Sequence, residues 1–158
     1  METQILNVAD ALIGVQRLFL DTAPVIYHVE GVAIYQPLTD IVFQGICNGA
    51  FEAVTSSVTL AECLVQPYRR GDMTLVQQFR DVITAGVHTR YVGVGAVAER
   101  AAELRARYNL SLTDAFQIAA ALATSCEAFL TNDVLLKRVT ELRILVLDEL
   151  LPNSPTSQ

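Results

Sequence analysis

The chain has 158 residues, a length typical of one domain that buries roughly 70% of the surface its unfolded chain exposes. Because 52% of the residues are hydrophobic and only 18% are charged, we expect one compact core with apolar surface left over for a homodimer or partner interface. The formal net charge of −6 argues against a nonspecific nucleic-acid-binding protein, which normally carries a basic face. It does not exclude a nuclease whose carboxylates bind a cation.

The cysteines and the N-terminus indicate a cytoplasmic protein. Cys47, Cys63 and Cys126 lie in apolar sequence without a C-x-x-C pair, so we expect buried free thiols in a reducing compartment. No basic residue precedes Arg17, no hydrophobic block of a signal peptide is present, and no apolar run is long enough to span a bilayer. The sequence therefore predicts a soluble protein without a membrane partner.

Strand and helix patterns alternate along the chain. After an N-terminal extension (1–16) with a short helix at 8–13, the apolar run 18–20 predicts a buried strand of a parallel sheet. Further strands are predicted at 51–55, 89–92, 128–131 and 143–147. Helices are predicted at 25–29, 37–48, 58–65, 72–85, 94–108 and 113–125, with Gly49 closing the second and with Pro67 and Gly71 forming the turn after the third. This order indicates a parallel sheet with right-handed crossovers in one domain, 17–150, followed by a disordered tail at 151–158.

Four acidic residues fall near the predicted ends of strands. Asp21 follows the first strand, Glu62 lies one helical turn beyond the second, Asp114 begins the helix that leads into the fourth, and Asp133 follows the fourth. Because ligands bind outside the carboxyl ends of parallel strands, we expect these side chains to meet at one edge of the sheet. Carboxylates and water are the ligands that Mg²⁺ or Mn²⁺ accepts. The chemistry that fits such a site is phosphodiester hydrolysis.

Each acid also has a structural interpretation. Asp21 could cap the helix after it, the sequences ending at Glu62 and Asp114 both match the capping box, and Asp133 could form an Asx-turn. Capping does not explain why all four acids occur at the same end of the sheet. Carboxylates crowded together also need a cation or protons to relieve their repulsion.

Four stretches of the chain resemble a known family. They are LFLDTAPVIY (18–27), TSSVTLAE (55–62), LTDAFQIAAAL (112–122) and FLTND (129–133). In this order and spacing they resemble the PIN-domain ribonucleases, most closely the VapC-type toxins of bacterial toxin–antitoxin pairs. The likeness extends over roughly residues 17–150. It implies a three-layer α/β/α PIN-like domain with a central, mainly parallel sheet of four to five strands.

The resemblance also implies a function. It assigns a Mg²⁺ site, with Mn²⁺ as an alternative, to Asp21, Glu62, Asp114 and Asp133. It adds Thr131 or Asn132 as the residue that orients a water or a phosphate. The implied protein is a homodimeric endoribonuclease, the toxin of a type II toxin–antitoxin system, whose cognate antitoxin covers the acidic pocket. One departure is that 134–136 (VLL) follows Asp133 where many relatives carry a second acid and an aromatic residue, so no fifth ligand is assigned.

Three other functions compete with this interpretation. Gly93–Ala98 (GVGAVA) matches a dinucleotide-binding pattern, but it lies mid-chain, and close helix packing with a flexible turn explains its glycines. A receiver-type phosphoacceptor would need a lysine near the end of a late strand, and Lys137, the only lysine, lies in a predicted helix. The third is a PIN-fold RNA- or protein-binding module without toxin activity. His28 and His88 are too far apart in sequence to indicate a histidine-based site.

Several basic and aromatic residues are candidates for holding RNA. The basic groups are Arg69-Arg70, Arg100-Arg105-Arg107 and Lys137-Arg138, although the pattern of each group taken alone favours a solvated helix face. Tyr27 and Tyr35 are candidates for stacking on bases. For Tyr27, which falls on the apolar side of its helix, core packing is the competing role.

Overall fold

The computed structural model describes residues 7–152, so 1–6 of the predicted extension and 153–158 of the predicted tail lie outside the described residues. Five parallel strands form one sheet in the order β3-β2-β1-β4-β5. They are β1 (Arg17–Leu20), β2 (Glu52–Ser56), β3 (Thr89–Val92), β4 (Ala128–Thr131) and β5 (Arg143–Val146). The predicted parallel α/β sheet is confirmed, and every pairing in it is parallel.

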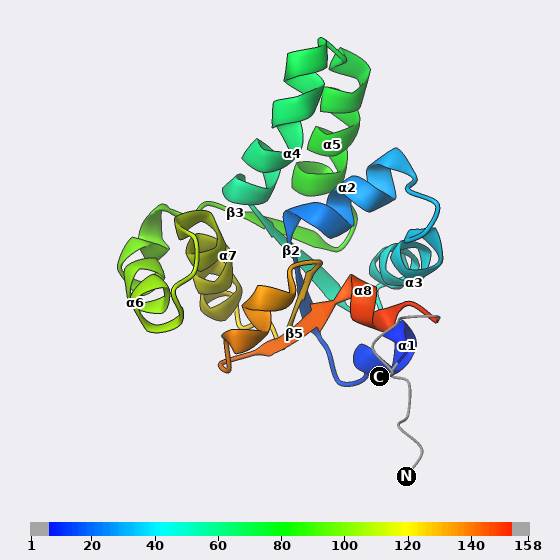
Figure 1. Cartoon of the computed structure of the whole chain (residues 1–158). Helices are drawn as coiled ribbons and strands as arrows, with labels where there is room; N and C mark the ends of the chain where they lie inside the picture. The colour runs from blue at the N-terminus through cyan, green and yellow to red at the C-terminus, as the bar shows by residue number, and fades with distance from the viewer. Residues whose placement is uncertain (1–6, 153–158) are drawn as a thin grey trace.

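Helices cover both faces of this sheet, which confirms the predicted three-layer arrangement. The helices are α1 (Val8–Ala11), α2 (Thr22–Glu30), α3 (Gln36–Cys47), α4 (Ser57–Arg70), α5 (Met73–Ala85), α6 (Ala98–Tyr108), α7 (Leu112–Ala123) and α8 (Leu147–Leu150), with short 3₁₀ helices η1 (Gly95–Val97) and η2 (Val134–Arg138). On one side of the sheet lie α6 and α7, while α1, α2, α3 and α8 lie on the other, and the α4–α5 pair extends away from the sheet (Figure 1).

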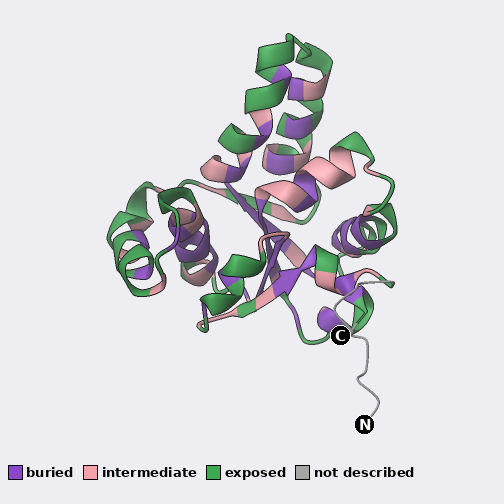
Figure 2. Ribbon diagram, in the orientation of Figure 1, coloured by how far each residue is buried: buried purple, intermediate pink, exposed green. Residues whose placement is uncertain are grey.

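The two faces of the sheet build two separate cores, because successive side chains of a strand point to opposite faces. Leu18 and Leu20 of β1 pack with the helices α1 to α5 and α8. Phe19, between them, packs with α6 and α7. On that face Phe19 stacks on Phe129 of β4, with ring centroids 5.0 Å apart and planes 5° from parallel. Figure 2 shows the central strands β1, β2 and β4 buried along most of their length, whereas the edge strand β3 is more exposed.

The predicted end of the third helix near Val65 is wrong, because α4 continues through Pro67 to Arg70. Proline removes one helical hydrogen bond, but the Pro67 ring is buried, and the apolar packing this provides offsets the loss. The helix ends at Gly71, whose φ of 66° is a left-handed conformation that favours glycine. The predicted turn at Gly71 is therefore confirmed, whereas Pro67 lies inside the helix and is not part of the turn. Gly49, with φ of 74°, likewise closes α3 as predicted.

Two smaller predictions are also wrong. Cys47, expected to be buried, is exposed because it is the last residue of α3 and faces away from the core, whereas Cys63 and Cys126 are buried free thiols as expected. Gly93 and Gly95 were attributed to close helix packing, yet an added Cβ at either would meet no atom within 4 Å. Between residues 7 and 152, every helix is too short or too polar to cross a membrane.

The stacked pair at the centre of the sheet makes a stability prediction. Phe129→Ala removes a completely buried ring and leaves a cavity beside Phe19, so the free energy of unfolding should fall by about 3 to 5 kcal/mol. Tyr91→Ala on the edge strand β3, where the side chain is 38% exposed, should cost less than about 1 kcal/mol. Urea unfolding of both variants checks this, and similar losses for the two would contradict it.

Candidate functional site

The acidic residues lie where the strand order of the sheet reverses. From β1 the chain proceeds to β2 on one side, and it returns to β4 on the other. Such a switch point is where open parallel sheets bind ligands, outside the carboxyl ends of the strands. Asp21 directly follows β1 and its backbone N–H donates to the Leu130 carbonyl of β4, 2.9 Å away. Asp133 follows the end of β4 by two residues.

Asp21 is a buried carboxylate with a donor on each oxygen. Its side chain is only 8% exposed. The Thr131 hydroxyl donates to Oδ2 over 2.8 Å, and the Gln117 amide nitrogen lies 3.4 Å from Oδ1. Asp21 occupies the N-cap position of α2, but its side chain makes no capping hydrogen bond. The capping interpretation therefore does not account for this residue.

Burial raises the pKa of Asp21 to about 6, with the Asp114 charge adding to the rise and the Thr22 backbone and Thr131 hydroxyl opposing it. No Lys, Arg or His pairs with any of the four candidate acids in the part of the chain that the structure describes. A buried carboxylate without a counter-charge is unfavourable unless a proton or a cation binds to it. The site is therefore electrostatically suited to receive a cation.

The other three acids are neighbours of Asp21 or of one another. Asp114 is half-buried, and both burial and the nearby Asp133 charge raise its pKa. Glu62 is exposed and accepts a 2.8 Å hydrogen bond from the hydroxyl of Thr22, the residue after Asp21. Asp114 thus lies near both Asp21 and Asp133, while Glu62 is linked to Asp21 through Thr22. Within residues 7–152, no group of three or more His, Cys, Asp and Glu side chains is placed so that it could hold a metal ion.

The alternative capping roles are met in part. Ser56 caps α4 by accepting from two backbone N–H groups, so Glu62 belongs to no capping box there. Ser111 caps α7 by accepting from the Asp114 N–H, 3.2 Å away. Asp133 does form the turn that its structural interpretation predicted, since its Oδ1 accepts from the Leu135 N–H over 3.0 Å. One oxygen of Asp133 is therefore engaged by the backbone.

Thr131 and Asn132, expected to orient a water or a phosphate, both bind protein groups. Thr131 is completely buried, and its hydroxyl accepts from the Asp133 N–H in addition to donating to Asp21. The Asn132 amide donates to the hydroxyls of Tyr27 and Tyr35, each 3.1 Å away. Its carbonyl oxygen accepts from the Asp148 N–H over 2.9 Å. These contacts fix the loop that carries Asp133.

The two tyrosines considered for base stacking are stacked on each other. The ring centroids of Tyr27 and Tyr35 are 4.1 Å apart and the planes differ by 5°. Both side chains are partly buried, and the Tyr35 hydroxyl also donates to Asp148 over 2.6 Å. The pair supports the Asn132 loop from the side of α2 and α3. This contact favours a structural role for both rings.

The sequence interpretation missed Gln117. This residue is completely buried in α7 and is bonded to Asp21, Thr59 and Ser56. A signal was present in the sequence, because Gln117 lies between apolar residues in the stretch LTDAFQIAAALA. Polar groups in such a position are nearly always hydrogen-bonded to a specific partner. The partner itself cannot be read from the pattern.

The basic groups considered for RNA binding mostly have partners within the protein. Lys137 pairs with Glu149 over 2.8 Å, which leaves the receiver-type interpretation without a lysine at the acidic edge. Arg107 pairs with Glu141, and Arg138 donates to a backbone carbonyl. In the described residues, Arg69 in the last turn of α4 has no ion pair or hydrogen bond of this kind.

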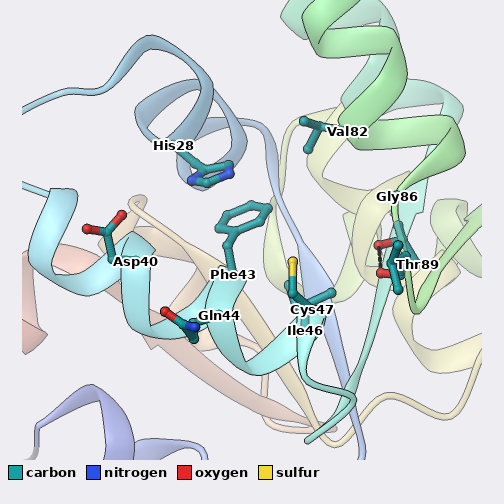
Figure 3. A pocket seen from close by; sticks show the side chains of 10 residues that line it. His28, Asp40, Phe43, Gln44, Ile46, Cys47, Val82, Gly86 and Thr89 are labelled. Atoms are coloured by element: carbon teal, nitrogen blue, oxygen red, sulfur yellow. Dashed lines mark hydrogen bonds between the residues drawn. The ribbon is translucent and has the colours of Figure 1, made fainter.

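A pocket of about 410 Å³ lies away from the acids. Its walls come from α2, α3, α5 and the start of β3, so it is near the amino ends of the strands (Figure 3). His28 stacks on Phe43 in its wall, and the exposed Cys47 thiol lies beside them. Burial lowers the pKa of His28, an effect that the nearby Asp40 opposes. This pocket and the acidic edge are therefore separate features of this protein.

The fold agrees with comparisons to known proteins. The PIN domain family matches residues 18–142. The chain belongs to the PIN-domain family. No curated protein matches the chain.

Solved structures of toxin–antitoxin proteins share the fold. VapBC2 of Rickettsia felis, bound to a DNA fragment from its promoter, is 16% identical, with 82% of this chain and 98% of that chain covered at a TM-score of 0.66. A toxin–antitoxin complex from Klebsiella pneumoniae is 20% identical; the match covers 82% of this chain and 97% of that chain, with a TM-score of 0.61. The Mycobacterium tuberculosis toxin VapC20, described as cleaving the sarcin–ricin loop, is 17% identical; the match covers 71% of this chain and 86% of that chain, with a TM-score of 0.58.

The raised pKa of Asp21 predicts a pH-dependent stability. As the pH rises from 4 to 6, the unfolded chain releases this proton while the folded protein holds it, so folding loses stability on the order of 2 to 3 kcal/mol. The Asn side chain of Asp21→Asn does not titrate, so this variant lacks the loss. The free energy of unfolding of the variant minus that of the unmodified protein should therefore increase from pH 4 to pH 7. Denaturant unfolding at both pH values measures the difference. Asp81→Asn, an exposed control on α5, should show no comparable change, and equal behaviour of the two variants would contradict the assignment.

Proposed function

We propose that this PIN-domain protein is a Mg²⁺-dependent endoribonuclease and the cytoplasmic toxin of a type II toxin–antitoxin system. The observation that carries the proposal is the buried Asp21 carboxylate at the sheet switch point, next to Asp114 and without a basic partner among the described residues. Residues 17–150 would form the catalytic domain. VapC20, which shares the fold, is described as a toxin that cleaves the sarcin–ricin loop, and this supports RNA as the substrate.

The donor set fits a hard divalent cation. Asp21, Glu62, Asp114 and Asp133 offer only carboxylate oxygens, which Mg²⁺ and Mn²⁺ accept, and Mg²⁺ needs few protein ligands because it keeps several waters. These four residues would hold the ion, and because no three of these described side chains already form a metal-holding group, they would have to move closer together around it. When bound, such an ion activates water and stabilises charge on a phosphate during in-line attack.

The protein side chains divide the remaining work. Asp21 is held by Thr131, and the loop carrying Asp133 is fixed by Asn132, so the acids keep their places without a substrate. Glu62 and the half-buried Asp114 give the site an open side on which RNA can approach. Arg69, two turns beyond Glu62 on α4, has no partner among the described residues and is the basic group best placed to contact the RNA backbone.

The same proposal covers the protein partners. Solved relatives of this fold are toxin–antitoxin complexes, and this supports a cognate antitoxin that covers the acidic edge. The high apolar content of the chain supports a homodimer as well.

Removing one acid should abolish cleavage without unfolding the protein. We expect Asp21→Asn and Asp114→Asn to reduce Mg²⁺-dependent cutting of single-stranded RNA at least about 100-fold, because each loses a charged ligand. A gel assay with a labelled RNA measures cutting, and EDTA should silence the unmodified protein. Glu99→Gln, an exposed acid at the start of α6, serves as the control and should cut normally.

The outcome also separates the competing functions. Cutting that persists in EDTA or in both site variants would contradict the metal-dependent mechanism. A PIN-fold binding module without toxin activity would bind RNA or protein but cut no RNA, and it would keep its binding in the Asp21→Asn variant.

The antitoxin proposal has its own test. A small protein encoded directly upstream should co-purify with this chain and suppress RNA cutting when both are expressed together. Size-exclusion chromatography and the same cleavage assay measure this. A chain that cuts equally well with and without that protein would act as a nuclease outside a toxin–antitoxin pair.

A further inference from the structure

Gln117 connects three elements that carry the candidate acids. It lies on α7 three residues after Asp114, so both side chains are on the same face of the helix. Its amide contacts Asp21 after β1 and Thr59 on α4, the helix that carries Glu62. These two contacts join residues separated by 96 and 58 positions in the chain. Among the four acids, Gln117 contacts only Asp21 directly. Asp114 and Glu62 are carried by the two helices that Gln117 joins, α7 and α4.

The direction of each hydrogen bond is fixed. The Ser56 hydroxyl donates to the Gln117 amide oxygen, while the amide nitrogen donates to Thr59 Oγ1 over 2.7 Å and to Asp21 Oδ1 over 3.4 Å. Thr59 in turn donates to the Leu20 carbonyl over 3.2 Å. A carboxylate can only accept, so the reversed amide would place two oxygens against each other. The orientation of the amide is therefore set by Ser56, Thr59 and Asp21 together.

We propose that Gln117 is a positioning residue that holds the Asp21 carboxylate in a metal-binding orientation; this rests on the proposed function. With Gln117 on one oxygen and Thr131 on the other, the rotation of the carboxylate is fixed. Each oxygen keeps a lone pair for a cation. Groups that hold a ligand in this way commonly raise metal affinity by one to two orders of magnitude.

A purely structural role for Gln117 makes a different prediction. A buried amide that only satisfies Ser56 and Thr59 would stabilise the fold, and its loss would lower stability without a selective effect on metal binding. Metal affinity and stability must therefore be measured in the same variants.

The test compares Gln117→Met with Thr59→Val. Methionine fills a similar volume without the amide, so it removes the contact to Asp21. Valine at position 59 removes a buried hydrogen-bonding hydroxyl of the same network and leaves the Gln117–Asp21 contact in place. Calorimetric titration with Mn²⁺ alone measures affinity, and thermal unfolding measures stability. We expect both variants to melt earlier, but only Gln117→Met to bind Mn²⁺ about 10- to 100-fold more weakly.

RNA cleavage adds a second measurement. In Gln117→Met, the Mn²⁺ concentration for half-maximal cutting should rise, and saturating Mn²⁺ should restore most of the turnover, because the acids themselves remain. Equal Mn²⁺ affinities of Gln117→Met and Thr59→Val would overturn the proposal. If Gln117→Met does not fold, Gln117→Asn retracts the amide by one methylene, and wild-type Mn²⁺ affinity in that variant would overturn it equally. A wild-type protein that neither binds Mn²⁺ nor cuts RNA would instead refute the proposed function.

Discussion

The arrangement of this protein depends on one carboxylate, Asp21, buried at the end of β1 without a positive partner among the described residues. The energetic cost of that burial appears in its pKa of about 6. The fold tolerates the cost because Thr131 and Gln117 each place a donor on the carboxylate and because the two cores of the sheet supply the compensating apolar burial. Stability is thereby lost at the point where the proposed function places a cation, and perturbed pKa values of this kind are common at functional sites.

The same constraint explains the polar residues around the site. Thr131 and Asn132 do not face an open cavity but bind Asp21, Asp133 and the stacked tyrosines. Their effect is to fix the loop after β4 relative to β1. Asp21 and the loop that carries Asp133 are thus held by contacts within the protein itself, as a preorganised site requires.

Much of this was predictable from sequence, for physical reasons. The strands at Thr89–Val92 and Ala128–Thr131 were predicted with their observed bounds, since short apolar or β-branched runs between turn residues leave few alternatives. The gathering of Asp21 and Asp114 at one edge followed from strand order. The end of α4 was misplaced because Pro67 signals a helix break locally, whereas its burial against the rest of the protein decides the outcome.

The hydrogen-bond partners could not be predicted in the same way. Gln117 stands out as a polar residue among apolar ones, but the sequence does not tell that its amide contacts Asp21 and not a neighbour on α7. Likewise Cys47 looks apolar in context, and only the orientation of the last turn of α3 exposes it. Such details depend on the placement of side chains between elements, which periodicity does not encode.

The long separation between Asp21 and Thr131 has a consequence during synthesis. Their hydrogen bond joins residues 110 positions apart, so a growing chain acquires this donor only when most of it has left the ribosome. β1 has no β4 to pair with before that point, and Asp133 is added later still. A nascent chain therefore cannot assemble the acidic edge early, and premature termination before residue 131 leaves a fragment without it.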